Sequence, residues 1–443
     1  MYGGEIMIIK DTKRTFFAFS PYECAAVEEY LGQMVDKGWL LESIKGNFFK
    51  FEKTDQKNLK YSVDVLHKVS IFDRKDSDVA LEYREYCKAA GWNYICQTGK
   101  IQIFYTHDDR EAISIHTDEE EKFKSVFKAS IYNVFGQFFL TLMFIFNLFI
   151  QLFLGDAGFV LASNLGILAI VSASTVILMN CVGFISFCSW IIKARGQLKR
   201  DKVMHYNNYK QIRMKSILTK IFGLLILSIL LKLLILDNIN NRGFNIYFLL
   251  VLCIPMIIMT YVKKFINKKR YSKNINMGII IGSVLISTYL VIMIVMGTVL
   301  LSSQETPRNE VPSEKVSLTF RDFGFKENND GSTYSMFDKS IVAQRIDYSS
   351  SNEENQLTYT IVESNSTLVI KFYKKRLLAR LNSYGIDLKR IKTSLPSNIV
   401  VYSDITKRSF ILVAEDKVVD IKKDFSGISE EEFLNVVCKK LLY

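Results

Sequence analysis

The strongest constraint on this chain is a run of 24 residues, Ile131–Leu154, that contains no charged side chain. A helix of this length rises far enough, at about 1.5 Å per residue, to cross the ~30 Å hydrocarbon core of a bilayer. Four further apolar runs follow it along the chain. We therefore predict a block of transmembrane helices over residues 131–301, with spans at 131–154, 165–192, 216–236, 244–262 and 275–301.

Basic residues are concentrated in two of the loops between these runs. Residues 193–215 hold eight Lys and Arg, and residues 263–273 hold six. Cytoplasmic loops of membrane proteins are enriched in this way, so the loops at 155–164 and 237–243 are expected outside. Five spans then place the N-terminus in the cytoplasm and the C-terminus outside, in a multi-pass protein of the plasma membrane. Because the residues before the first span are polar, that span is expected to act as an uncleaved insertion signal.

The formal net charge of +12 belongs to the membrane block, because the regions on either side of it are each close to neutral. The basic character therefore does not predict direct nucleic-acid binding by either domain. The loop at 193–215 is expected to anchor on anionic lipid. Its alternative role is to dock an acidic partner or nucleic acid, with Tyr206 and Tyr209 available for stacking.

Residues 1–130 have the pattern of a cytosolic α+β domain. The segment Ser20-Pro21-Tyr22-Glu23 predicts a helix start, with serine as the N-cap, proline at the first helical position and glutamate closing a capping box. This helix is expected to end at Lys37, before Gly38-Trp39. A second helix, at residues 76–90, is expected to end in the same way before Gly91-Trp92.

The two Gly-Trp pairs are 53 residues apart, and so are Gly46 and Gly99. This spacing predicts an internal duplication in which each repeat is a helix, a glycine, a tryptophan and strands. With a leading strand at residues 15–20, the order becomes β-α-β-β-α-β, so we predict a ferredoxin-like fold. The tryptophans are expected to pack the helix ends onto the sheet, with ligand stacking as the alternative.

Several short segments of this domain, taken together, resemble the DUF2812 family of membrane proteins. They are Phe17-Ala18-Phe19, Lys37-Gly38-Trp39-Leu40, Tyr61 with Val63-Asp64, Glu82-Tyr83 and Ala90-Gly91-Trp92. The family has no known function and is found chiefly in Gram-positive bacteria. The resemblance implies an N-terminal domain of this kind ahead of several membrane spans. It also implies frequent genetic linkage to PadR-type transcriptional regulators, hence a cytosolic regulatory partner, and it supplies no catalytic residues.

The predicted spans contain few polar side chains. The amides of Asn147, Gln151 and Asn180 are expected to bond between helices, and Lys232 to reach the headgroups. Pro255 is expected to kink the fourth span, either as a gate or as tolerated packing. Since no carboxylate lies inside a span, a proton relay is not expected.

Residues 302–317 are polar and contain two prolines, so we predict a linker, followed by an extracytoplasmic α+β domain at 318–443. Its first part, 320–339, is expected to be irregular, with a turn at 328–331. The basic run at 371–380 is expected to form a solvated helix face, or else to bind a polyanion or lipid headgroups. The regular elements are predicted as strands at 341–348, 356–363, 399–403, 409–414 and 417–422 and as helices at 367–384 and 430–442, the last capped by Ser429.

No motif for a nucleophile, a phosphate-binding loop, a metalloprotease or a dinucleotide site occurs in a suitable context. The four histidines and seven cysteines are dispersed, so we name no catalytic, cofactor-binding or metal-binding residue and do not expect an enzyme. A folded domain on each side of an odd number of spans favours a transmembrane regulator or sensor that couples the outer domain to a cytosolic partner. The alternative is a component of a transport or resistance system. The bilayer is the expected partner in both cases, and a homo-oligomer is compatible with both.

Overall fold

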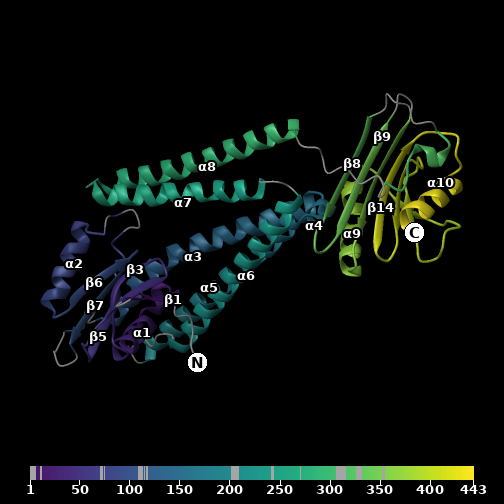
Figure 1. Ribbon diagram of the computed structural model, residues 1–443. Helices are drawn as coiled ribbons and strands as arrows, with labels where there is room; N and C mark the ends of the chain where they lie inside the picture. Colours follow the sequence, from purple (N-terminus) through teal and green to yellow (C-terminus); the bar gives the residue numbers. More distant parts are fainter. Residues whose placement is uncertain are drawn as a thin grey trace. The chain divides into compact units, whose positions relative to one another are not determined.

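The structure is a computed structural model that describes residues 6–9, 12–69, 73, 75–107, 113, 115, 118–200, 209–240, 244–269, 271–305, 316–325, 332–351 and 355–443. The chain forms two compact units (Figure 1). The N-terminal unit contains residues 1–142 and 175–298, and the C-terminal unit contains residues 143–174 and 299–443. Each unit therefore combines a folded domain with parts of the long helices.

The N-terminal unit begins with an α+β domain of two antiparallel sheets. The four-stranded sheet has the order β1-β2-β4-β3 and the three-stranded sheet the order β5-β7-β6. Their strands are β1 (Ile6–Ile9), β2 (Thr12–Phe16), β3 (Trp39–Lys45), β4 (Phe48–Lys53), β5 (Leu59–Val65), β6 (Asn93–Thr98) and β7 (Ile101–His107), with helices α1 (Cys24–Asp36) and α2 (Asp78–Ala89).

The predicted repeat is present in the backbone. Strands β2, β3 and β4 with α1 have the same order of pairing as β5, β6 and β7 with α2. All four predicted glycines have positive φ, at +80° and +91° for Gly38 and Gly91 and at +61° and +57° for Gly46 and Gly99. Each repeat also carries an irregularity at the same offset, between Leu41 and Ser43 in the first and at the corresponding place in β6 in the second. Residues with a side chain are strained in the left-handed backbone conformation, so glycine is favoured at these helix ends and hairpin turns.

The ferredoxin-like prediction is wrong. That fold joins its strands in one sheet, whereas here they form two sheets, with the edge strands β3 and β6 lying side by side. The reason is local: in each repeat the strand before the helix pairs with the second strand of the hairpin that follows it, as β2 does with β4 and β5 with β7. The pairing is thus completed within each repeat. Trp92 is buried, and its indole nitrogen donates to the carbonyl of Ile113 at 2.8 Å, which is the expected packing role.

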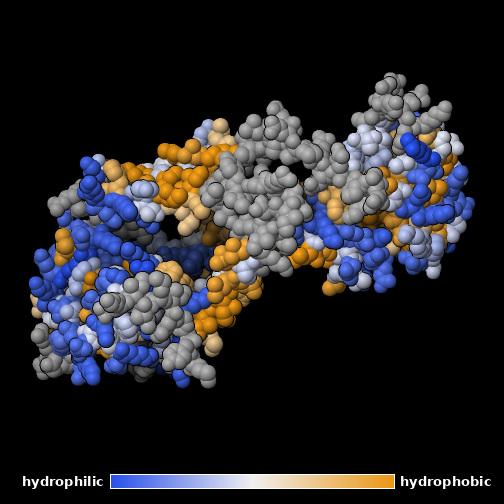
Figure 2. Space-filling model, viewed as in Figure 1, coloured by the Kyte–Doolittle hydropathy of each residue, from blue (hydrophilic) through white to orange (hydrophobic). Residues whose placement is uncertain are grey.

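All five apolar runs lie in helices. These are α3 (Glu119–Phe149) with a π-helical turn at Ile150–Leu154, α5 (Asn164–Arg200), α6 (Tyr209–Asn240), α7 (Phe244–Lys268) and α8 (Lys273–Glu305). In the described part of the chain, three helices are long and apolar enough to cross a membrane, at Glu119–Leu154, Asn164–Arg200 and Lys273–Val291. Figure 2 shows apolar surface along these long helices and hydrophilic surface over the domains.

The predicted loops between these runs are shorter than expected. Helices α5 and α6 extend into the basic segment at both ends, so only residues 201–208 of it lie outside the described residues. Residues 302–305, predicted as linker, are the end of α8, and the rest of that linker up to residue 315 is not described. Pro255 lies inside α7, which continues through it.

The C-terminal unit is built on a seven-stranded antiparallel sheet with the order β11-β12-β13-β14-β10-β9-β8. Its strands are β8 (Ser332–Lys339), β9 (Gln344–Ser351), β10 (Gln356–Glu363), β11 (Lys389–Ile391), β12 (Val400–Ser403), β13 (Ser409–Val413) and β14 (Lys417–Asp424), with helices α9 (Thr367–Ser383) and α10 (Glu430–Val437). One face of the sheet packs with α10 through Phe410 and Phe433. The other packs with α9 through Val362 and Tyr373.

The predicted strands and helices of this domain agree with the structure to within a few residues, apart from β8 and β11. Residues 332–339 were expected to be irregular but form the edge strand β8. Residues 333–339 of this strand are exposed or half-buried. The sequence STYSMFDK therefore lacks the regular alternation of apolar and polar residues that predicts a half-buried strand. The expected turn at 328–331 lies outside the described residues.

Candidate functional site

The predicted outer loop at 155–164 is the centre of the candidate site, and it is not a free loop. It contains a short helix, α4 (Ala157–Ala162), that packs on the C-terminal domain. Asp156 caps this helix, since its Oδ1 accepts a hydrogen bond from the backbone N–H of Gly158 at 3.0 Å. Short polar side chains at this position satisfy backbone donors that the helix leaves unpaired.

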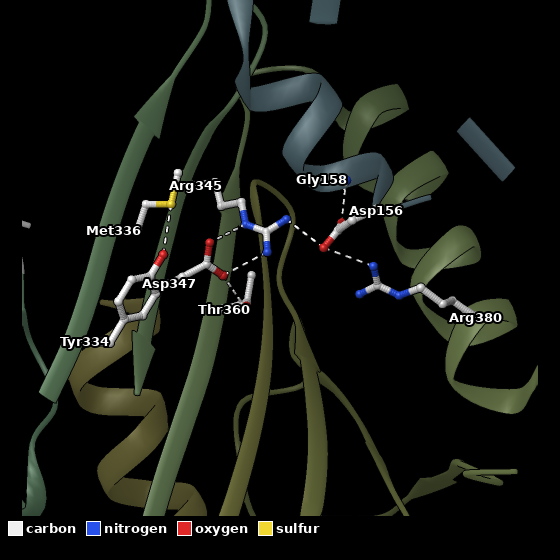
Figure 3. A network of polar contacts seen from close by, with 8 residues as sticks. All are labelled: Asp156, Gly158, Tyr334, Met336, Arg345, Asp347, Thr360 and Arg380. Atoms are coloured by element: carbon white, nitrogen blue, oxygen red, sulfur yellow. Dashed lines mark hydrogen bonds and ion pairs between the residues drawn. The ribbon is translucent and has the colours of Figure 1, made fainter. Parts of the chain in front are cut away.

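The same carboxylate pairs with two arginines of the domain. Its Oδ2 lies 2.8 Å from a guanidinium nitrogen of Arg345 in β9 and 2.9 Å from one of Arg380 in α9. Figure 3 shows Asp156 between the two guanidinium groups. The carboxylate of Asp156 thus joins the loop to β9 and to α9, both of which lie far from the loop in the sequence.

Arg345 is held in place from the strand side. Its Nε and Nη2 donate to the two carboxylate oxygens of Asp347 at 2.6 and 2.9 Å, a bidentate geometry that fixes the guanidinium plane. On the neighbouring strand the hydroxyl of Thr360, which lies opposite Asp347 in register, donates to Asp347 at 2.6 Å (Figure 3). Arg345 is only 11% exposed, so this pairing is largely removed from water.

Burial and ion pairing shift the pKa values of the acids at this site in opposite directions. Burial raises the pKa of Asp156, but the ion pairs with Arg345 and Arg380 outweigh it and hold that pKa below its usual value. Burial raises the pKa of Asp420, in β14 near the same arginines. Asp338 in β8 is shifted in the same direction by burial. The site therefore combines one carboxylate whose pKa is lowered by ion pairs with two whose pKa values are raised by burial.

Apolar contacts and three further hydrogen bonds fasten the loop around this centre. Leu161 is buried in the core under α9. Its carbonyl accepts from the hydroxyl of Ser340 at 2.6 Å, and the side chain of Asn164 accepts from the backbone N–H of Ile341 at 3.2 Å. Before α4 in the sequence, the carbonyl of Leu152 accepts a hydrogen bond from Arg376 at 3.2 Å.

Gly158 allows α4 to lie this close to the domain. A Cβ atom built at this position would be 2.6 Å from the ring of Tyr373 and 3.2 Å from Val362. Tyr373 is only 2% exposed, so its ring has little room to move. Burial raises the pKa of its hydroxyl, which has no hydrogen-bond partner among the described residues.

The basic run at 371–380 therefore has a role that neither expectation covered. Its residues Arg376 and Arg380 bind the loop, while Lys371 and Lys375 lie on the exposed face as expected. The sequence signal for this role was weak, because an Asp after a glycine in a short loop and arginines in a distant helix do not indicate one another.

The N-terminal domain contacts α5 and α6 through the residues of the predicted capping box. The box is present: Glu23 accepts from the backbone N–H of Ser20 at 2.7 Å, in a short 3₁₀ turn, Pro21–Glu23, ahead of α1. Glu23 is only 2% exposed and also pairs with Lys215 of α6 at 3.0 Å. Tyr22 packs on Phe187 of α5, with ring centroids 5.6 Å apart.

Tyr209, considered above for stacking on a ligand, stacks instead on rings of the domain. Its centroid lies 5.7 Å from that of Tyr30 and 6.0 Å from that of Phe17. Tyr206 lies outside the described residues. Lys215 likewise binds protein, so the basic segment at 193–215 is in part a docking element of the N-terminal domain.

The amides of the predicted spans have structural partners. Asn180 of α5 donates to the hydroxyl of Thr141 in α3 at 2.9 Å, which is the expected bond between helices. Asn147 and Gln151 bond to each other along one helix at 2.7 Å. The side chain of Lys232 lies outside the described part of the structure. Among the described residues, no group of three His, Cys, Asp or Glu side chains is placed to hold a metal ion.

Part of the chain matches a known protein family. Residues 24–140 match the model of a family described as a protein of unknown function, DUF2812. The match runs from the start of α1 into α3, so it covers the first repeat without β2, the whole second repeat and part of the first apolar run. No curated protein and no solved structure matches the chain.

Proposed function

Since residues 24–140 place this chain in the DUF2812 family, whose function is unknown, we propose its function from its geometry: a non-catalytic membrane regulator or sensor. In this proposal the C-terminal domain responds to a ligand outside the cell. The helices carry the response to the N-terminal domain, which binds or releases a cytosolic partner.

The proposal includes five membrane spans, a plasma-membrane location, a cytoplasmic N-terminus and an extracytoplasmic C-terminus. Two contacts support these sides when combined with the distribution of basic loops. The N-terminal domain binds Lys215 and Tyr209, which belong to the basic segment expected in the cytoplasm. The C-terminal domain binds Asp156, in the loop expected outside.

The observation that carries the proposal is the double pairing of Asp156 with Arg345 and Arg380. It makes the loop that joins α3 to α5 part of the folded C-terminal domain. A ligand that prefers one arrangement of this domain would therefore act on the two helices directly. Coupling requires only that the ligand bind the two arrangements with different affinities.

The partner in the cytosol is proposed, from the family resemblance, to be a regulator of the PadR type. A homo-oligomer is compatible with this role. The alternative, a transport component, would need polar side chains left free along the spans. Asn180 is instead bonded to Thr141, which favours helix packing over a pathway.

The test compares gene expression in cells that carry the wild-type chain, the Asp156→Ala variant or a chain ending at residue 301. We expect both changes to alter expression of the linked regulator's targets at equal protein levels. The control is Asp387→Ala, which removes an exposed acid of the same domain whose ion-pair distance to Lys389 is 3.5 Å. If the truncated chain supports the wild-type response, the sensor role is refuted.

The sides are tested separately with a membrane-impermeant maleimide on intact cells. Cysteine replaces Ile405, which is 82% exposed in the C-terminal domain, or Tyr86, which is 63% exposed in the N-terminal domain. We expect labelling at 405 in intact cells and at 86 only after the membrane is broken. The opposite pattern, or protection of both, contradicts the proposed orientation.

A further inference from the structure

A groove of about 1200 Å³ lies between the first turns of α3 and the last turns of α5, within the N-terminal unit. Four cationic side chains line it: Lys124 and Lys128 from α3, and Arg195 and Lys199 from α5. Within each pair the residues are four apart, so they lie on one face of their helix. All four are exposed.

Three of these cations are available to a ligand. Lys124 pairs with Glu120 at 2.8 Å. Lys128, Arg195 and Lys199 form no ion pair with a carboxylate in the described part of the chain. The acids that line the groove, Asp118, Glu119 and Glu120, all lie at one end of it, at the start of α3.

Away from these acids the groove has an apolar lining. Phe123 is buried between Phe127 and Trp190, with ring centroids 6.0 and 5.4 Å away. Phe127 and Ile192 line the groove, and Ile192 is 73% exposed. An exposed isoleucine beside aromatic rings is costly in water but not against acyl chains.

The groove lies where both helices change from charged to apolar sequence. Lys128 is the last charged residue before the uncharged run that begins at Ile131, and Lys193 is the first after the run that ends at Ile192. In a membrane this boundary falls at the level of the lipid headgroups. Gly196 lines the groove between the two cations of α5, and a Cβ atom there would meet nothing within 4 Å, so the space beside it is open.

We propose that this groove binds an anionic phospholipid, whose phosphodiester is held by Lys128 and Arg195 and whose acyl chains lie along Phe127 and Ile192. The guanidinium of Arg195 offers two parallel donors to a phosphate, and Lys128 adds a point charge. The acids at the start of α3 lie on the side away from the acyl chains, and they disfavour a soluble polyanion that would extend past the headgroup. The proposal rests on the insertion of α3 and α5 in a membrane, which is part of the proposed function, and not on the sensing role.

The test uses the full chain in lipid nanodiscs that contain phosphatidylcholine with or without phosphatidylglycerol. Native mass spectrometry then counts the lipids retained by the released protein. We expect retention of phosphatidylglycerol in preference to phosphatidylcholine. The double variant Lys128→Gln/Arg195→Gln should bind phosphatidylglycerol about twenty-five-fold more weakly, since each basic residue near anionic lipid contributes about a factor of five.

Two further variants separate the site from general charge effects. Gly196→Leu fills the groove without changing a charge and should also abolish the preference. Its backbone conformation accepts a side chain and its Cβ meets no neighbour. The control Lys371→Gln/Lys375→Gln removes two exposed lysines of α9 and should bind lipid as the wild type does.

Equal retention of the two lipids, or an unchanged preference in Gly196→Leu, overturns the proposal. Displacement of phosphatidylglycerol by soluble glycerol phosphate also overturns it, because the site would then bind free anions. A chain that fails to enter the nanodiscs refutes the membrane insertion itself, and a chain that binds lipid but has no effect on gene expression refutes only the sensing role.

Discussion

Removal of the Asp156 carboxylate should release α4 from the C-terminal domain. Two contributions are lost in Asp156→Ala: the N-cap to Gly158, which is typically ~1 kcal/mol, and the pairing with Arg345 and Arg380. Breaking a buried pair costs roughly 3–5 kcal/mol. Here the cost is lower, about 2 kcal/mol, because Asp156 is 28% exposed and Asp347 still neutralises Arg345. The docked state should therefore lose about 3 kcal/mol, or roughly a hundredfold in population.

The assay measures how often the docked loop opens. Ala162, which is fully buried beneath the domain, is replaced by cysteine in the full chain, and its maleimide labelling is followed on the peptide that carries residue 162. We expect labelling to be about a hundredfold faster with Asp156→Ala, while Asp387→Ala leaves the rate unchanged. An increase of less than about threefold would show that apolar contacts alone hold α4, and the reasoning from the ion pairs would be refuted.

The pH dependence of this effect has a definite sign. The pKa of Asp156 is lowered in the docked state, so its contribution is present above its ordinary pKa of 3.8 and is lost as the pH falls through the lower, docked-state pKa. The ratio of labelling rates between variant and parent should be constant from about pH 5 to pH 8 and should shrink only in stronger acid.

Three further changes test other parts of the structure. Gly158→Ala should cost about 1–3 kcal/mol and increase the same labelling, because its Cβ would overlap the buried ring of Tyr373. Asp420→Asn should increase hydrogen-exchange protection of β14 at pH 7–8 and match the wild type near pH 3. Burial raises the pKa of Asp420 above its ordinary value of 3.8. The folded wild type is therefore stabilised below pH 3.8 and loses that stability as the pH rises through the raised pKa. A double-mutant cycle of Glu23→Ala and Lys215→Ala, read by exchange protection of α1, should give a coupling of about 2 kcal/mol because the pair is buried on the Glu23 side.

Each of these changes has a matched control in the chain. In Gly282→Ala the new Cβ meets no neighbouring atom, so the labelling of residue 162 should not increase. Asp424→Asn alters an exposed acid of the same strand, and Glu42 with Lys50 forms an exposed ion pair suited to a parallel cycle. Effects of equal size in these controls would show that burial and close packing do not determine the effects of the three changes.

The features that the sequence predicted correctly depend on nearby residues. Capping boxes, glycine stops and alternating strands are set by positions two to four residues apart, so the box at Ser20 and the strands around Ile361 could be found from the sequence. The docking of the loop could not. Asp156 lies far from Arg345 and Arg380 in the sequence and meets them only in the folded domain, and an aspartate before a short helix is equally compatible with a solvated cap.

The contacts of the two repeats could not be predicted from the sequence either, because two repeats with similar folds can contact different parts of the chain. The residues at equivalent positions decide what each helix contacts. Glu23 of the first repeat pairs with Lys215 of α6, whereas its equivalent, Asp76, pairs at 2.8 Å with Arg84 of its own repeat. Arg84 in turn occupies the position of Leu31, which is fully buried in the first repeat.

Equivalent positions of the two repeats also differ in exposure. Ala26 in α1 is 1% exposed, whereas its equivalent in α2, Val79, is 44% exposed. A spacing of 53 residues predicts the backbone of both repeats, since glycine is required at the same turns in each. The spacing does not predict what each repeat contacts: Glu23 of the first repeat pairs with Lys215, which lies 192 residues further along the chain in α6.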